Sequence, residues 1–174
     1  MGRILQVVGF QNSGKTTFVT EYIKACVEAH LKVGTIKHHG HGGASLHHDQ
    51  QKDTGKHRQA GAHVSLVEGN GSFILSTDKL SLTLTQMIIL YNMFELDVIL
   101  VEGFKFERYP KVVLLRGEED IDLLDKLENV CCILAGFPLP KIYSGKFRIY
   151  SNMYECINWL INTKAGEYID NSNV

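Results

Sequence analysis

Several features that would place this chain in a specialised class are missing or scarce. It has four cysteines among 174 residues, and no two of them form a C-x-x-C pair. Positive and negative side chains nearly balance at a net charge of −1, and no apolar run approaches the length of a membrane span. Met1-Gly2-Arg3 leads directly into an apolar segment, with no secretory signal. These absences predict a cytoplasmic protein with reduced cysteines, and neither a membrane nor a nucleic acid as its partner.

A glycine-containing segment near the start carries the strongest functional signal. Residues 9–17 read G-F-Q-N-S-G-K-T-T and complete the pattern G-x-x-x-x-G-K-T. An apolar run precedes the segment and a stretch with apolar residues at helical spacing follows it, which is the strand–loop–helix order that phosphate binding requires. Lys15 would reach the β- and γ-phosphates of a nucleotide, and the Thr16 hydroxyl would ligate Mg²⁺. The residues predicted to bind nucleotide are Gly9, Gln11, Asn12, Ser13, Gly14, Lys15, Thr16 and Thr17.

Strand and helix patterns alternate along the chain. Strands are predicted at residues 4–8, 32–37, 98–101, 111–116 and 130–134, and helices at 18–27, near 53–60, from Ser81 or Thr83 to Phe94, and after Ser151 as its cap. Two short strands at residues 62–67 and 72–76 flank Asn70-Gly71, a strong hairpin signal. The pattern predicts an α/β protein with the three-layer P-loop NTPase fold, a mostly parallel central sheet and a β-hairpin. We expect one nucleotide-binding domain at residues 1–163 and a polar, frayed tail at 164–174.

Two acidic residues are candidates for a metal site. Glu102 follows Val98–Val101, four apolar residues that indicate a strand buried on both faces. The carboxyl ends of parallel strands share one edge of a sheet, so Glu102 is expected beside the glycine loop, where it could hold Mg²⁺ directly or through water. Asp53 could reach the same magnesium shell, or could instead cap a short helix. The acidic stretch 118–122 is expected to be a solvated face, and no residue stands out as a catalytic base.

Histidines are concentrated in one polar, glycine-containing region. Seven of the eight lie between His38 and His63. They could contact phosphates or an anionic partner, form a polar loop without a function, or hold a transition metal, although no cysteine joins them and their spacing matches no zinc finger. The candidates for anion or partner contacts are His38, His39, His41, Arg58 and Lys105.

Several blocks of the sequence together resemble the MobB family, the molybdopterin-guanine dinucleotide biosynthesis proteins B. They are the loop G-F-Q-N-S-G-K-T-T, the segment I-K-H-H-G-H-G at residues 36–42, the segment around Lys52-Asp53-Thr54, and D-V-I-L-V-E-G-F-K at residues 97–105. The resemblance covers about the first 115 residues, and Gln51 stands where the family commonly has glycine. It implies a GTP-binding adapter with weak GTPase activity. The adapter would act beside the MobA-type guanylyltransferase, which joins GMP to molybdopterin, and a homodimer is expected.

Two other functions remain open from the sequence alone. The histidine cluster would suit a metal-delivering GTPase, and the phosphate loop would suit a small-molecule kinase with Arg58 or Arg108 steadying the transferred phosphoryl group. The sequence holds no Asn-Lys-x-Asp motif for guanine, so the preference for GTP over ATP follows from the resemblance. Residues 135–138 and Ser151-Asn152 are positional candidates for base contacts. Whether molybdopterin itself binds the histidine loop is also left open.

Overall fold

A computed structural model describes residues 2–38, 52–77 and 80–168. These residues group into two compact units, residues 1–38 with 84–174 and residues 39–83. The sequence prediction treated residues 1–163 as one domain and did not separate the units. The predicted contacts of His39 and His41 lie outside the described residues.

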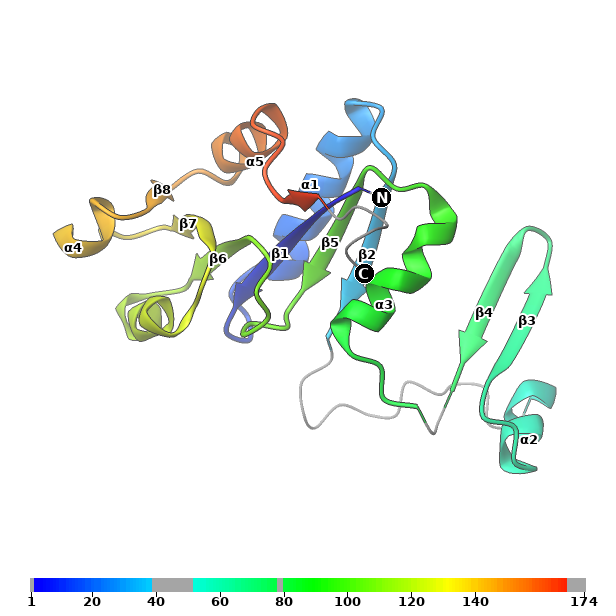
Figure 1. Cartoon of the computed structure of the whole chain (residues 1–174). Helices are drawn as coiled ribbons and strands as arrows, with labels where there is room; N and C mark the ends of the chain where they lie inside the picture. Colours follow the sequence, from blue (N-terminus) through cyan, green and yellow to red (C-terminus); the bar gives the residue numbers. More distant parts are fainter. Residues whose placement is uncertain (1, 39–51, 78–79, 169–174) are drawn as a thin grey trace. The chain divides into compact units, whose positions relative to one another are not determined.

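The first unit is built on a seven-stranded sheet (Figure 1). Its strands run in the order β2-β5-β1-β6-β7-β8, and all neighbours along this path are parallel. The short strand β9 pairs antiparallel with the first residues of β1, ahead of the point where β6 begins to pair with it. The strands are β1 (Arg3–Gly9), β2 (Val33–Lys37), β5 (Val98–Glu102), β6 (Lys111–Leu115), β7 (Val130–Ala135), β8 (Arg148–Tyr150) and β9 (Glu167–Tyr168).

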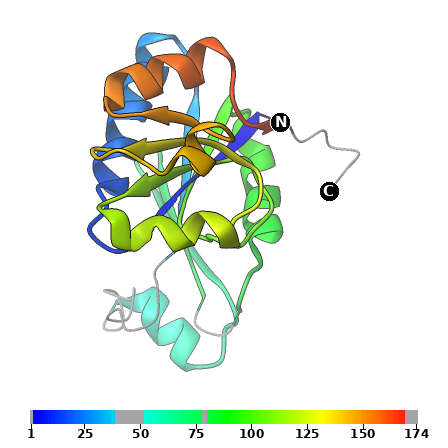
Figure 2. The ribbon, with the colours of Figure 1, turned by 90° about the vertical axis from the view of Figure 1, so that its left-hand side faces the viewer.

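Helices cover both faces of this sheet, which confirms the predicted three-layer α/β architecture with a mostly parallel sheet. One face packs against α1 (Lys15–Glu28) and α5 (Met153–Asn162) through a cluster that includes Leu5, Phe18 and Leu160. The other face packs against α3 (Leu84–Leu90), through Ile4 and Ile88, and against the 3₁₀ segment η2 (Glu118–Lys126). Figure 2 shows α1 and α5 on one side of the sheet and α3 on the other. Because strands such as β5 are covered on both faces, their central residues are apolar without alternation.

The second unit contains α2 (Asp53–Gln59) and the antiparallel hairpin of β3 (Ser65–Gly69) and β4 (Ser72–Ser76) (Figure 1). Asn70 and Gly71 connect the strands with φ angles of 52° and 75°. Two positive φ angles are what a two-residue hairpin turn requires, and asparagine and glycine adopt them most readily. The separate hairpin and its turn are therefore confirmed.

Several predictions at the ends of elements were wrong. The N-cap of α5 is Asn152, whose Oδ1 accepts hydrogen bonds from the Tyr154 and Glu155 amides, and Ser151 lies one residue before it. The predicted helix to Phe94 ends at Leu90 and continues as a 3₁₀ turn, η1 (Tyr91–Phe94). Part of the expected frayed tail is paired, because Glu167 and Tyr168 form β9. The short elements α4 (Lys141–Ser144) and β8 were not predicted.

The cysteines are free thiols in the described chain, three of them buried and Cys131 half-buried. Cys132 and Cys156 are adjacent, with 3.6 Å between their sulfur atoms, and the hydrogen bond between them with their burial raises the pKa of Cys132. A high thiol pKa keeps the thiolate of Cys132 scarce and this thiol unreactive. No helix among the described residues has the length and apolar character needed to cross a membrane.

Candidate nucleotide-binding site

The glycine loop joins the end of β1 to the start of α1. Gly9 is buried, and a Cβ on it would lie 2.6 Å from the Leu114 carbonyl oxygen, so a side chain would push β6 away. Gly14 precedes the helix with a φ of 82°, a conformation that favours glycine. Asn12 also has a positive φ, of 61°. The loop therefore needs Gly9 for its close packing against β6 and Gly14 for its positive φ angle.

Lys15 folds back over this loop. Its ammonium group donates hydrogen bonds to the Phe10 carbonyl oxygen and to Ser13 Oγ. Partial burial is the main reason that the pKa of Lys15 lies below the usual value. Glu102 opposes this decrease in pKa, and the neighbouring cations Lys105, Lys37 and Arg116 add to it. A cation held among other cations is poorly compensated, and an anion in the loop would supply the missing negative charge.

Thr16, Glu102 and Lys37 form a compact polar cluster at the same edge. Thr16 is the second residue of α1, and Glu102 and Lys37 end the neighbouring strands β5 and β2. Thr16 Oγ1 donates to Glu102 Oε1 over 3.1 Å, and Lys37 Nζ lies 3.0 Å from that same oxygen and 3.3 Å from Thr16 Oγ1. A hydroxyl and a carboxylate oxygen therefore already share one cation, the ammonium group of Lys37.

This donor set fits magnesium. Mg²⁺ prefers oxygen ligands and commonly takes one hydroxyl or carboxylate from a protein together with phosphate oxygens and water. Thr16 and Glu102 are the residues that would hold it, and the ammonium group of Lys37 in contact with both shows that a positive charge is accommodated there. Their part in a metal site stays a prediction. The second unit holds the third predicted ligand, Asp53, which is the first residue of α2 and forms an exposed ion pair with Lys56. Its part in a metal site also stays a prediction.

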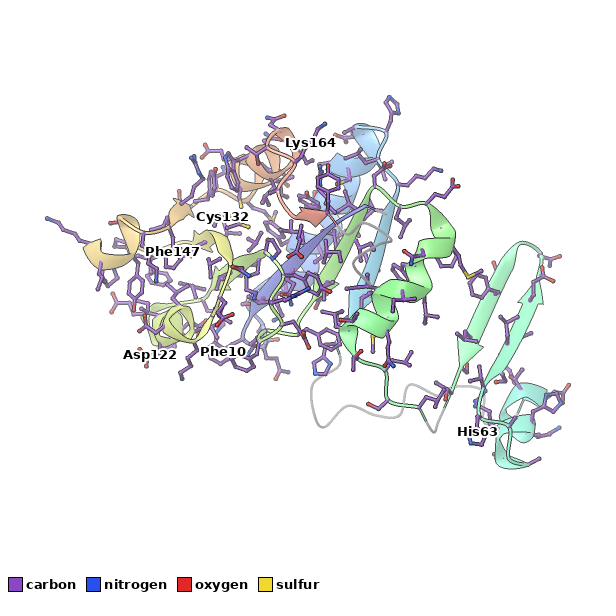
Figure 3. The ribbon with its side chains drawn as sticks, viewed as in Figure 1. Phe10, His63, Asp122, Cys132, Phe147 and Lys164 are labelled. Carbon is purple, nitrogen blue, oxygen red and sulfur yellow. The ribbon has the colours of Figure 1, made fainter. Side chains whose placement is uncertain are left out.

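Two cations lie against the aromatic ring of Phe10, the residue just past the end of β1, which is labelled in Figure 3. Lys105 Nζ lies 4.2 Å from the ring centroid, and the Arg116 guanidinium carbon lies 5.5 Å from it. Arg116 also donates to the Gln11 carbonyl oxygen over 3.3 Å. Both cations thus stand beside the loop and contribute to a positive potential that favours phosphate groups.

Asp120 fixes the direction of Arg116. Its carboxylate accepts hydrogen bonds from Arg116 Nε, at 2.9 Å, and from Nη2, at 2.6 Å, and also from the Arg116 amide. These bonds hold the pKa of Asp120 below its usual range. The side chain of Asp120 is only 1% exposed. The prediction that residues 118–122 form a solvated face was therefore wrong for Asp120, although Glu118 and Glu119 are exposed.

The turn after β5 is held from inside the sheet. Gln6, buried in β1, donates through Nε2 to the carbonyl oxygens of Gly103 and Phe104, over 3.2 and 2.8 Å. The Phe104 ring contacts the His38 ring with 4.5 Å between centroids. His38, one of the predicted anion contacts, thus lies at the edge that carries Glu102, and its amide donates to the Glu102 carbonyl oxygen over 2.9 Å.

Arg58 is placed differently from the prediction. It lies in the second unit at 3% exposure, and its Nη1 donates to Ser65 Oγ. Its guanidinium group therefore serves the packing of that unit, and we assign no anion to it. Among the described residues, no group of three or more histidine, cysteine, aspartate or glutamate side chains is arranged to hold a metal ion.

Sequence reasoning missed the roles of Lys37, Arg116 and Asp120. Lys37 was part of the recognised I-K-H-H-G-H-G block but received no role, because its contact with Glu102 depends on the pairing of distant strands. Arg116 and Asp120 are four residues apart with opposite charges. That spacing is a signal for a local ion pair and could have been used.

Comparison with known proteins settles the family. The sequence model of MobB, described as molybdopterin guanine dinucleotide synthesis protein B, matches residues 4–135. The chain belongs to the MobB family. A MobB relative from Bacillus subtilis (strain 168), named a probable molybdopterin-guanine dinucleotide biosynthesis adapter protein, is 44% identical over 130 residues, which is 75% of each chain. A relative from Escherichia coli (strain K12), named an adapter protein for the same biosynthesis, is 33% identical and aligns over 65% of each chain.

Solved MobB structures share the fold. The crystal structure of Bacillus subtilis MobB superposes with a TM-score of 0.74 at 36% identity, covering 95% of this chain and 99% of that one. A MobB homologue from Bacillus stearothermophilus gives a TM-score of 0.71 at 34% identity, covering 92% and 96%. The predicted MobB resemblance and fold class are confirmed. The alternatives of a metal-delivering GTPase and a small-molecule kinase find no support among these relatives.

Proposed function

We propose that this chain is a GTP-binding adapter with weak GTPase activity in molybdenum cofactor biosynthesis, which assists the attachment of GMP to molybdopterin to form molybdopterin guanine dinucleotide. One observation carries the proposal: the glycine loop, Lys15 and the Thr16–Glu102 pair converge at one edge of the sheet. The adapter role is supported by the names of the relatives from Bacillus subtilis and Escherichia coli.

Each group at this edge has a distinct task in the proposed site. The loop amides and the N-terminus of α1 would orient the phosphates, and Lys15 would leave the Phe10 carbonyl oxygen to neutralise their charge. Thr16 and Glu102 would hold Mg²⁺, which when bound neutralises charge on the β- and γ-phosphate oxygens. Arg116, directed by Asp120, and Lys105 would raise the positive potential at the outer side of the loop.

Weak hydrolysis is expected because the two carboxylates beside the glycine loop are already engaged. In the part of the chain that the structure describes, Glu102 is engaged by Thr16 and Lys37, and Asp120 is engaged by Arg116. Neither carboxylate is placed to accept a proton from an attacking water. Without a residue that positions or deprotonates water, a P-loop protein hydrolyses GTP slowly. Slow GTP hydrolysis suits an adapter that acts in its GTP-bound state and not through the products of hydrolysis.

Guanine preference is part of the proposal and rests on the family. Residues 135–138 begin at the last residue of β7, and Ser151-Asn152 follow β8, so both stretches lie at the carboxyl edge that carries the glycine loop. Asn152 already uses its side-chain oxygen to cap α5. The backbone of residues 135–138 is therefore the better candidate for contacts with the base.

The proposed partners are a MobA-type guanylyltransferase, molybdopterin and a second copy of this chain, all in the cytoplasm. The hairpin supports the homodimer. Leu66 and Leu75 are register partners on one face, and Val67 and Ile74 are partners on the other. All four side chains are exposed, at 46 to 63%. A two-stranded hairpin with apolar residues on both faces is marginal in water, and burial against another copy would stabilise it.

Calorimetric titration with GTP, GDP and ATP in the presence of Mg²⁺ tests nucleotide binding. We expect Mg-GTP to bind in preference to Mg-ATP, and failure of Mg-GTP to bind the intact chain would overturn the proposal. Co-purification with the guanylyltransferase, with and without GTP, tests the adapter role. A complex that GTP strengthens is expected, and Lys15→Ala should remove the effect of GTP while leaving the chain folded.

A further inference from the structure

Lys37 occupies a position where a P-loop protein would bind its metal. Its Nζ lies 3.0 Å from Glu102 Oε1 and 3.3 Å from Thr16 Oγ1, the two oxygen atoms assigned above to Mg²⁺. Those two oxygens are themselves 3.1 Å apart. A single positive charge thus sits against both metal ligands in the nucleotide-free chain.

The register of the sheet delivers Lys37 to this position. Lys37 and Glu102 are cross-strand partners at the ends of β2 and β5, and register partners on adjacent parallel strands point to the same face. Both side chains therefore stand on the face of the sheet that packs against α1, in whose first turn Thr16 lies. Ile36, the residue before Lys37, is buried and anchors the backbone of β2.

The contact is also easy to release. The side chain of Lys37 is 55% exposed, whereas that of Glu102 is 12% exposed. A lysine ammonium group on a flexible stem can swing into water without disturbing the core, so its departure would leave Glu102 and Thr16 in place. The other cations of the site have different partners: Lys15 bonds to Phe10 and Ser13, Lys105 lies over the Phe10 ring, and Arg116 bonds to Asp120.

We infer that Lys37 is an internal counterion that occupies the divalent-cation position in the nucleotide-free protein and is displaced when Mg²⁺ arrives with a triphosphate. Two cations cannot share one carboxylate oxygen at these distances without strong repulsion. Bound metal and the contact of Lys37 with Glu102 therefore exclude each other, so Lys37 must leave Glu102 when the metal binds. When metal is absent, the ammonium group remains and supplies part of the positive charge that the phosphates need. The inference rests on the proposed nucleotide site, but it does not depend on guanine or on the adapter role.

The test compares the dissociation constant of GTP in excess EDTA with that in excess Mg²⁺, measured by calorimetry. The dissociation constant in EDTA divided by that in Mg²⁺ should be about tenfold higher in Lys37→Met than in the intact chain. The reason is that the charge-assisted contact of Lys37 with the phosphates, which the variant loses, exists only when metal is absent. Lys105→Met is the matched control. It removes the same charge beside the same loop without touching Thr16 or Glu102, so it should weaken binding alike under both conditions and leave the ratio unchanged.

An unchanged ratio in Lys37→Met, or an equal rise in Lys105→Met, would overturn the inference, since either result makes Lys37 one cation among several. Lys37→Gln provides a second variant, and circular dichroism confirms that each variant is folded.

The same titrations with inorganic tripolyphosphate separate this inference from the proposed function. If GTP and ATP bind alike but the tripolyphosphate ratio rises in Lys37→Met, guanine preference fails and the role of Lys37 stands. If the intact chain binds no Mg-tripolyphosphate, both fail.

Discussion

Lys37 Nζ and Glu102 Oε1 lie 3.0 Å apart at the ends of two adjacent parallel strands, although 65 residues separate them in the chain. Glu102 was identified from its place after an apolar run, and Lys37 was quoted only as part of a motif. The contact between them connects the phosphate loop to the end of β2, from which the chain continues through His38 into the histidine-rich segment. Thr16, Glu102 and Lys37 therefore form one polar cluster at this edge of the sheet.

The first prediction concerns Lys15. Lys15→Ala should weaken triphosphate binding by about a hundredfold or more, because the ammonium group is the loop's own countercharge for the β- and γ-phosphates. The side chain bonds only within the loop region, so unfolding free energy should stay within about 0.5 kcal/mol. Calorimetry and a urea melt measure the two quantities. Lys24→Ala is the control and should bind normally, because Lys24 is an exposed residue of the same helix that pairs with Glu21. Normal affinity in Lys15→Ala would contradict the role given to it.

A second prediction concerns the packing of the loop against β6. Gly9→Ala should lower the unfolding free energy by about 1–3 kcal/mol, since the new Cβ would meet the Leu114 carbonyl oxygen at 2.6 Å and backbone must move. Triphosphate affinity should fall with it. Gly136→Ala serves as the control, because a Cβ there meets nothing within 4 Å. Denaturant unfolding measures the unfolding free energy of both variants. Equal values for Gly9→Ala and Gly136→Ala would contradict the prediction, because they would show that the loop can shift at no cost in stability.

The Arg116–Asp120 pair should make stability depend on pH. The pKa of Asp120 is lowered in the folded chain, so its contribution is present above the usual carboxyl pKa and is lost as pH falls through the lowered value. Asp120→Asn should therefore be less stable than the intact chain at pH 7, by about 1 kcal/mol given that Arg116 stays partly in water. Unfolding measured from pH 7 down to pH 3 should show the two proteins converging. A difference that stays constant over this range would mean that the carboxylate charge is not what matters.

The hairpin prediction addresses self-association. Replacing Leu66 and Ile74 together by serine removes one exposed apolar side chain from each face of the hairpin. If the hairpin forms the contact between copies, the double variant should be monomeric at concentrations where the intact chain is a dimer. Sedimentation equilibrium measures this, and tripolyphosphate binding should be retained. Ile142→Ser is the control, since Ile142 is an exposed apolar residue of α4 at 75% exposure and should leave the dimer intact. A double variant that remains dimeric would place the contact elsewhere.

Local patterns predicted most elements correctly. The glycine loop, the buried strand before Glu102 and the Asn70-Gly71 turn each depend on neighbours in sequence, and the structure has all three. The two short strands that were missed depend on distant partners. β9 has two residues and exists through its pairing with β1, and β8 has three residues and pairs with β7. Such short strands carry no periodicity of their own.

The sequence by itself determined that this chain has a G-x-x-x-x-G-K-T loop at the end of a strand, a carboxylate at the end of a second buried strand, and the blocks of the MobB family. These follow from residue type and spacing along one stretch of chain. Only the tertiary structure decided which cation meets which carboxylate. Strand order and register bring Lys37 to Glu102 and Thr16, while Asp120 forms an ion pair with Arg116. Register is fixed by burial across the whole sheet, so no single segment could have revealed that a lysine of β2 contacts both Thr16 and Glu102.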